Sequence, residues 1–129
     1  MLFKDLELNI VGVSEDLSVT ADADQLRQVM INLMLNAAQA LQGRGRLEVT
    51  LSRVSGSAQI HVDDSGPGIP VEDQERVFQP FFSTKAHGEG TGLGLPLSRK
   101  LVEGQDGEIS IQKSLLGGAR LTVSLPLSE

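Results

Sequence analysis

Two asparagines four residues apart, Asn32 and Asn36, have the side-chain type and spacing that fit metal chemistry. Positions i and i+4 of a helix lie on one face, so the two amides would sit one above the other. Amide oxygens are neutral ligands that Mg²⁺ accepts, commonly together with substrate phosphates. The alternative is a structural stripe of amides that bond to one another or to a loop. The pair therefore predicts either an inert stripe or a metal that arrives with a phosphorylated ligand.

The segment 22–43 is the helix that must present these asparagines. At 100° per residue its apolar side chains cover most of the circumference, which predicts a helix buried nearly all round. Asp22 followed three residues later by Gln25 fits a capping box, and Gly43 stands where a left-handed stop belongs. The remaining wedge is a stripe of carboxamides, formed by Gln25, Gln28, Asn32, Asn36 and Gln39.

The stretch DDSGPGIP offers a second group with chemistry, the carboxylate of Asp64. An ionised carboxylate only accepts hydrogen bonds, so it suits an exocyclic amine such as that of adenine. Gly66 and Gly68 would let a flat ligand approach the backbone without meeting side chains. A plain turn after a strand explains the same residues equally well.

The stretch GEGTGLGLPLSRK leads glycine-rich backbone into a helix start, where N–H groups point toward any anion in front of them. It lacks the Gly-Lys-Ser/Thr ending of a Walker A loop and follows a loop where a Rossmann fingerprint follows a strand. Lys85, just ahead of these glycines, has the charge and position to reach a terminal phosphate. A flexible hinge with a solvated lysine is the alternative.

Composition narrows the classes of partner. The chain has 129 residues, no cysteine and a formal net charge of −6, which fits one domain with its own core. Phosphate-backbone binding relies on Lys and Arg, so the acidic balance argues against nucleic acid as a partner. No apolar run approaches a membrane span, so we expect no direct membrane contact from this chain. The absence of cysteine agrees with a cytoplasmic location.

Alternating apolar and polar residues predict about five strands, with a hairpin turning at Ser55-Gly56. Two further helices are expected, a short one over 71–77 and a longer one from Thr91 to Glu103. One apolar face on the strands and about three helices to cover it predict an α+β fold. We expect a two-layer α/β sandwich with a mixed, mostly antiparallel sheet. The candidate ranges for these strands are 6–12, 47–51, 58–62, 109–111 and 121–125, with a short additional one at 17–20.

Three further features of the sequence carry separate expectations. Phe78 and its neighbours Phe81 and Phe82 are expected to anchor the base of the glycine-rich loop in the core. His61 lies on the polar side of a predicted strand and is expected to be an ordinary surface residue. Along the second long helix, Leu93, Leu97, Leu101 and Val102 recur at helical spacing.

Four stretches together carry a resemblance that none carries alone. QVMINLMLNAAQA, DDSGPGIP, VFQPFFSTK and GEGTGLGL resemble, in order and spacing, the N, G1, F and G2 boxes of the ATP-binding catalytic domain of sensor histidine kinases. The resemblance runs from about Leu17 to Pro126 and is greatest to kinases of the nitrogen-regulation and dicarboxylate-sensing type. It implies the Bergerat fold for one catalytic domain over 1–129. It also implies that Mg-ATP donates its γ-phosphate to a histidine on a separate dimerisation domain, in two-component signal transduction.

The resemblance also implies roles for individual residues. Asn36 would coordinate Mg²⁺, with Asn32 beside it contacting phosphate or metal. Asp64 would accept the adenine amine, in a pocket shaped by two glycines, Gly66 and Gly68. The lid and phosphate cradle would comprise Lys85 and the backbone of Gly90, Thr91, Gly92, Leu93 and Gly94. Asn32 and Lys85 would be the catalytic side chains.

The phosphoacceptor histidine of such kinases lies on a two-helix dimerisation domain and is typically followed by an acidic residue. Here His61 is followed by Val62 and His87 by Gly88, so we expect that domain to be absent from this chain. It would be the direct partner, and a response regulator would be reached through it. The parent protein could be anchored to a membrane.

The sequence also departs from the family in places. Ser65 replaces the usual Asn, Gln105-Asp106 replaces a common His-Gly, and the turn LLGGAR lacks its first glycine. None of these positions is expected to touch the ligand contacts directly.

Other Bergerat-fold functions are the alternatives. ATPases of the gyrase, chaperone and mismatch-repair group usually place a Glu four residues before the metal-binding Asn, to activate water. This chain has Asn32 there, which argues against vigorous hydrolysis. A serine kinase that antagonises sigma factors and a non-catalytic ATP-binding module are the other candidates.

Overall fold

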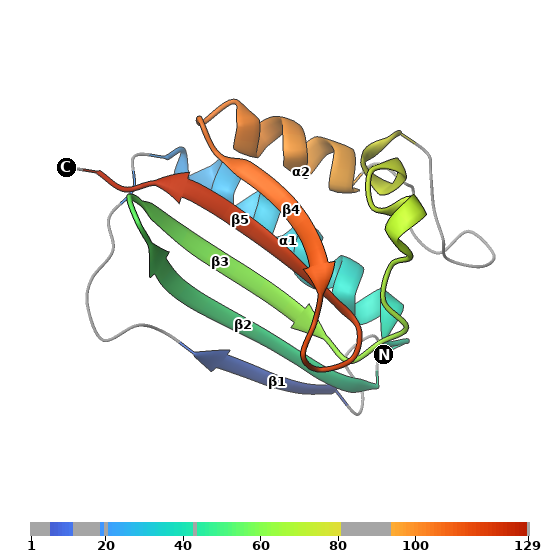
Figure 1. Cartoon of the computed structure of the whole chain (residues 1–129). Coiled ribbons are helices and arrows are strands. Elements are labelled where there is room, and N and C mark those ends of the chain that lie inside the picture. The colour runs from blue at the N-terminus through green and yellow to red at the C-terminus, as the bar shows by residue number, and fades with distance from the viewer. Residues whose placement is uncertain (1–5, 12–18, 20, 43, 81–93, 129) are drawn as a thin grey trace.

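The computed structural model describes residues 6–11, 19, 21–42, 44–80 and 94–128. The five strands form one sheet in the order β1-β2-β3-β5-β4, in which only β1 and β2 are parallel neighbours. Both α-helices cover one face of this sheet (Figure 1). The predicted α+β sandwich is therefore confirmed. Its elements are β1 (Leu6–Val11), α1 (Ala23–Ala40), β2 (Gly45–Val54), β3 (Ser57–Asp64), the 3₁₀ turns η1 (Val71–Asp73) and η2 (Arg76–Phe78), α2 (Gly94–Glu103), β4 (Glu108–Lys113) and β5 (Ala119–Pro126).

The core lies between the helices and the sheet. Leu33 of α1, Val62 of β3 and Leu121 of β5 are fully buried there. The buried residues of α1 recur about every fourth position, and the apolar residues with which β5 faces the helices recur every second position, as Leu121, Val123 and Leu125 do. Among the described helices, none combines the length and the apolarity that a membrane crossing requires.

Helix α1 is amphipathic, so the prediction that it is buried nearly all round is wrong. Ile31 and Leu35 are 44% and 37% exposed, on the side that faces away from the core. The sheet and α2 cover only part of the circumference, because a two-layer sandwich has no third layer to cover the outer side. The buried face is formed by Val29, Leu33, Ala37 and Ala38.

The ends of α1 follow the predicted signals in part. The side chain of Asp22 accepts a hydrogen bond from the backbone N–H of Gln25 at 2.9 Å, as a capping box requires. In a capping box the N–H of Asp22 would donate to the side chain of Gln25. Here it donates to Oε1 of a distant residue, Gln105, at 2.7 Å. At the other end Gln42 adopts a left-handed φ of 54°, and Gly43 lies outside the described residues.

Several predicted elements differ in extent. Residues 71–78 form the turns η1 and η2 where one short helix was expected. Of the strand expected at 17–20, only Val19 is described, and it forms a single bridge to Leu127. Helix α2 begins at Gly94 in the described part of the chain, and its Leu97 is 44% exposed despite its helical spacing.

Phe78 packs against the core, as predicted, while Phe81 and Phe82 lie outside the described residues. The guanidinium carbon of Arg99 on α2 lies 4.5 Å from the centre of the Phe78 ring. Arg99 also forms an ion pair with Glu75, with an N–O distance of 3.1 Å. These contacts tie α2 to the turn η2.

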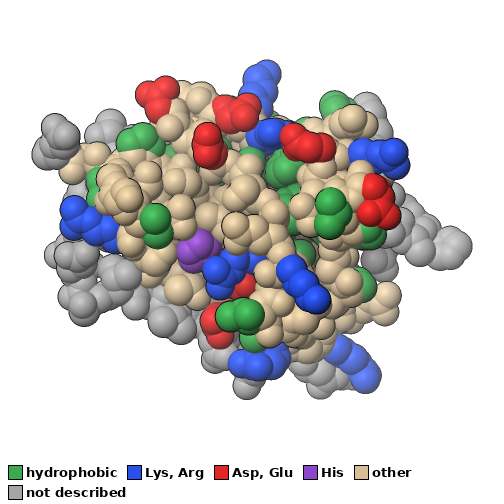
Figure 2. Space-filling model, viewed as in Figure 1, with side chains coloured by type: hydrophobic (Ala, Val, Ile, Leu, Met, Phe, Trp, Pro, Cys, Tyr) green, Lys and Arg blue, Asp and Glu red, His purple; other side chains and the backbone are tan. Residues whose placement is uncertain are grey.

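The face of the sheet that points away from the helices is polar, as Figure 2 shows. His61 lies on this face but is only 9% exposed, so its prediction as an ordinary surface residue is wrong. Its ring nitrogens lie 2.8 Å from Oγ1 of Thr122 and 3.2 Å from Oγ of Ser52. Burial lowers the pKa of His61, and the charge of Arg120 lowers it further. The ring of His61 thus links β3 to both of its neighbouring strands, β2 and β5.

Candidate functional site

Strand β3 ends in two adjacent carboxylates that point to opposite faces of the sheet. Asp63 faces the polar side, where its Oδ1 accepts hydrogen bonds from Nε of Arg120 and Oγ of Ser114, both at 2.8 Å. Asp64 continues the row of Val62 and faces the helices, with only 2% of its surface exposed. The alternation of a strand therefore assigns Asp63 to an internal ion pair and leaves Asp64 on the side of the predicted site.

The carboxylate of Asp64 is held by backbone on one oxygen only. Oδ1 accepts from the N–H of Gly66 at 2.9 Å and from the N–H of Ala119 at 3.2 Å. Among the described residues, Oδ2 has no hydrogen-bond partner. Burial raises the pKa of Asp64, and the two backbone N–H donors oppose that rise. Among the described residues, the fully buried side-chain oxygen without a partner is Oδ2 of Asp63, on the other face of the sheet, whereas Oδ2 of Asp64 is not fully enclosed and suits an N–H group of a ligand.

The structure brings the two predicted glycines close to Asp64. A Cβ on Gly66 would lie 3.1 Å from Oδ1 of Asp64 and 3.4 Å from the backbone oxygen of Ala40 at the end of α1. Gly68 has a φ of +80°, which favours glycine, and its missing Cβ would lie 3.6 Å from the backbone of Gly118. Backbone packs closely around the carboxylate, so both glycines are required by contacts within the protein.

Asn32 has protein partners for both atoms of its amide. Nδ2 donates to Oγ of Ser98 at 3.2 Å and to the backbone oxygen of Gly94 at 3.4 Å, while Oδ1 accepts from Nε2 of Gln28 at 3.0 Å. Ser98 is fully buried in α2. These hydrogen bonds are of the kind that the structural alternative for the amide stripe describes, and they tie α1 to the start of α2.

The replacement Asn32→Ala is expected to lower the free energy of unfolding by about 1–3 kcal/mol, because it leaves the buried hydroxyl of Ser98 without this partner. Urea denaturation of the single variants and of the Asn32→Ala, Ser98→Ala pair measures the coupling between the two side chains. A coupling energy of zero would show that the tie contributes nothing to stability.

Asn36 lies one turn further along α1, toward the end that meets Gly66, and is half-buried. Its side-chain or backbone groups already have a partner within the protein. The described residues contain no cluster of three or more His, Cys, Asp or Glu side chains able to hold a metal. Mg²⁺ accepts amide oxygens together with phosphate oxygens, so Asn36 stays a predicted ligand.

The remaining predicted residues divide into two groups. Gly94 begins α2 beside Asn32, with the amide carbon of Asn32 3.9 Å from the position of its missing Cβ. The others lie outside the described residues: Lys85, Gly90, Thr91, Gly92 and Leu93.

Gly118 and Ala119 contact Asp64 but are not among the residues that the sequence predicts for the site. The N–H of Gly118 donates to the backbone oxygen of Asp64 at 3.0 Å. The paired glycines of LLGGAR are the signal that could have pointed to a close approach of backbone. The expectation that this turn touches no ligand contact is wrong for Asp64.

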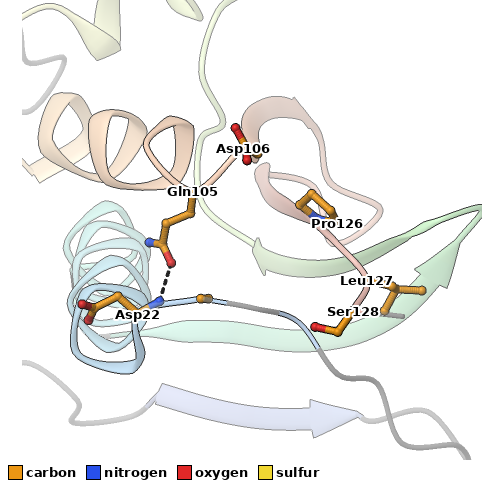
Figure 3. A pocket seen from close by; sticks show the side chains of 7 residues that line it. Asp22, Gln105, Asp106, Pro126, Leu127 and Ser128 are labelled. Carbon is orange, nitrogen blue, oxygen red and sulfur yellow. Dashed lines mark hydrogen bonds between the residues drawn. The ribbon is translucent and has the colours of Figure 1, made fainter.

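A cavity of about 410 Å³ lies at the opposite end of β3 (Figure 3). Pro126, which lines the cavity, pairs with Ser57 at the start of β3. Ser57 and Asp64 lie at opposite ends of this strand, roughly 23 Å apart at about 3.3 Å per residue. None of the site residues predicted above lines it. The lining residues are Ala21, Asp22, Gln105, Asp106, Pro126, Leu127 and Ser128.

The model of the family described as histidine kinase-, DNA gyrase B-, and HSP90-like ATPase matches residues 21–129. The chain belongs to this family. Over 95% of this chain, it is 42% identical to the two-component sensor PprA of Pseudomonas aeruginosa. Over 85% of this chain, it is 44% identical to the sensor histidine kinase ZraS of Escherichia coli O157:H7. The chain spans 14% of PprA and 24% of ZraS.

Solved structures agree with this assignment. The catalytic domain of histidine kinase ThkA is 34% identical, with a TM-score of 0.83 over 95% of this chain and 80% of that one. Full-length ShkA in complex with AMPPNP is 27% identical, with a TM-score of 0.82 over 95% of this chain and 26% of ShkA. The chain is thus homologous to the catalytic domains of sensor histidine kinases.

Proposed function

We propose that this chain binds Mg-ATP between α1 and the Asp64 end of the sheet and donates the γ-phosphate to a histidine on a separate dimerisation domain. The observation that carries the proposal is the buried carboxylate of Asp64, with Oδ1 held by backbone and Oδ2 without a donor among the described residues. The homologue ShkA in complex with AMPPNP supports a nucleotide as the ligand.

In this proposal Asp64 accepts a hydrogen bond from the adenine amine, and Gly66 and Gly68 let the base approach the backbone. Asn36 would hold Mg²⁺ together with the nucleotide phosphates. The ion, when bound, neutralises part of the phosphate charge. Lys85 and residues 90–93 would hold the terminal phosphate.

Transfer rather than hydrolysis is proposed because an amide cannot remove a proton from water. The position four residues before Asn36 is Asn32, whose amide is engaged by Gln28 and by α2. The protein then contributes positioning and charge stabilisation, while the imidazole of the partner domain attacks the γ-phosphorus and ADP leaves. Asn32 would contact phosphate or metal only by giving up one of these bonds.

The partners proposed for this domain are a histidine-bearing dimerisation domain and, through it, a response regulator. Histidine kinase ThkA, 31% identical over 95% of this chain, has been solved in complex with the response regulator TrrA. We infer that residues 1–129 act as a single catalytic domain in such an assembly.

Labelled Mg-ATP tests the proposed reaction when this chain is mixed with a purified histidine-bearing helical domain. Acid-labile, base-stable phosphate on that domain is the expected result, because phosphohistidine has this stability. The same acceptor with its histidine replaced by Gln is the control. Acid-stable phosphate on a protein serine would instead support an anti-sigma kinase, and free phosphate without labelled protein would support an ATPase.

A further inference from the structure

The turn between β4 and β5 packs directly against the Asp64 carboxylate. A Cβ added to Gly118 would lie 2.1 Å from Oδ1 of Asp64, 2.6 Å from its backbone oxygen and 2.6 Å from the backbone nitrogen of Gly66. Real Cβ contacts are not this short, and two of the three atoms are backbone atoms that cannot rotate away. Any side chain at Gly118 therefore displaces Asp64, the Gly66 loop or both.

The same turn supplies hydrogen bonds that fix the orientation of Asp64. The N–H of Gly118 donates to its backbone oxygen at 3.0 Å, and the N–H of Ala119 donates to Oδ1 at 3.2 Å. The turn is itself anchored, because the N–H of Ser114 donates to the backbone oxygen of Gly118 at 2.8 Å. Oγ of Ser114 donates to Asp63 at 2.8 Å. Both carboxylates at the end of β3 are therefore held by this turn.

We propose that Gly118 is a positioning residue for adenine recognition. By lacking a Cβ, it allows the β4–β5 turn to hold Oδ1 of Asp64 and leaves Oδ2 directed to the ligand. The inference rests on the proposed function, since it assigns the adenine amine to Asp64. It predicts that the turn determines the preference for a base with a 6-amine over a base with a 6-oxo group.

The test compares Gly118→Ala with Gly56→Ala, using ATP and ITP as the two probes. Gly56 lies in the β2–β3 turn, where an added Cβ would meet nothing within 4 Å. In Gly118→Ala we expect ATP affinity to fall by about 10- to 100-fold, the effect of losing one hydrogen bond to a charged group. ITP affinity should change little, because hypoxanthine has no 6-amine. Gly56→Ala should keep the wild-type affinities and their ratio.

The outcomes separate this inference from the proposed function. Wild-type protein that fails to bind ATP, or an Asp64→Ala variant that binds ATP as the wild type does, would overturn the proposed site. If those controls behave as expected but Gly118→Ala keeps the wild-type ratio of ATP to ITP affinity, the role of Gly118 is overturned alone. A parallel fall for both nucleotides would also overturn it, because it indicates a general structural defect.

A second variant, Ala119→Pro, keeps the test decisive if Gly118→Ala does not fold. Proline is tolerated at the first residue of a strand, and it removes the N–H that donates to Oδ1 of Asp64. That donor opposes the rise in the pKa of Asp64, so its loss should raise this pKa further. The acid limit, meaning the pH below which ATP binding is lost, should therefore move to higher pH. An unchanged acid limit together with an unchanged ATP-to-ITP ratio would overturn the inference.

Discussion

Replacing Asp64 with alanine is expected to lower the affinity for ATP by about 10- to 100-fold, the effect of losing one hydrogen bond to a charged group. Asp64 is 2% exposed and faces the helices, so water cannot easily replace the lost acceptor. Isothermal titration calorimetry with ATP measures the change. The companion variant Asp64→Asn keeps an oxygen for the N–H groups of Gly66 and Ala119, and it should lose affinity with less loss of stability.

The neighbouring carboxylate offers a matched control for this variant. Asp63 is equally buried but bonds to Arg120 and Ser114 on the opposite face of the sheet. Asp63→Asn should lower the free energy of unfolding and leave ATP affinity within about twofold, since it alters no group on the helix side. Equal losses of affinity in the Asp63 and Asp64 variants would contradict the assignment of the adenine contact.

Replacing Asn36 with alanine is expected to remove most of the gain in ATP affinity that Mg²⁺ provides. Loss of a partner one shell beyond a metal already costs about 10- to 100-fold in metal affinity, so loss of a direct ligand should cost at least about 100-fold. Titrations of ATP with Mg²⁺ and with EDTA, on wild type and variant, isolate the metal-dependent part.

The control variant is Gln25→Ala, which removes an exposed amide near the other end of α1. It should leave the Mg²⁺-dependent gain in ATP affinity intact. Circular dichroism and urea denaturation check that Asn36→Ala stays folded. If its metal-dependent gain equals that of the wild type, Asn36 does not hold the ion.

Local patterns in the sequence predicted most of the fold. Alternation in β2 and β3 fixed both the hairpin and its inward face, where Val49 pairs with Val62. The extent of burial could not be read in the same way. Ile31 and Leu35 of α1 are apolar yet exposed, because helical periodicity carries no information on how many layers surround the helix.

The candidate site was predictable only where its parts are close in sequence. Asp64, Gly66 and Gly68 lie in one loop, and the structure brings them together. Ala119 is 55 residues from Asp64 and reaches it only because β5 pairs with β3, and Ser98 is 66 residues from Asn32. Contacts of this range depend on strand order and helix packing, which no local pattern specifies.

The location of bound ATP tests the central claim most directly. Amide chemical shifts recorded by NMR during titration with Mg-ATP distinguish the two ends of the sheet. We expect the largest shifts at Gly66, Gly68 and Ala119, around Asp64. Shifts confined to Asp22, Gln105 and Asp106, which line the cavity of about 410 Å³ at the other end, would contradict it.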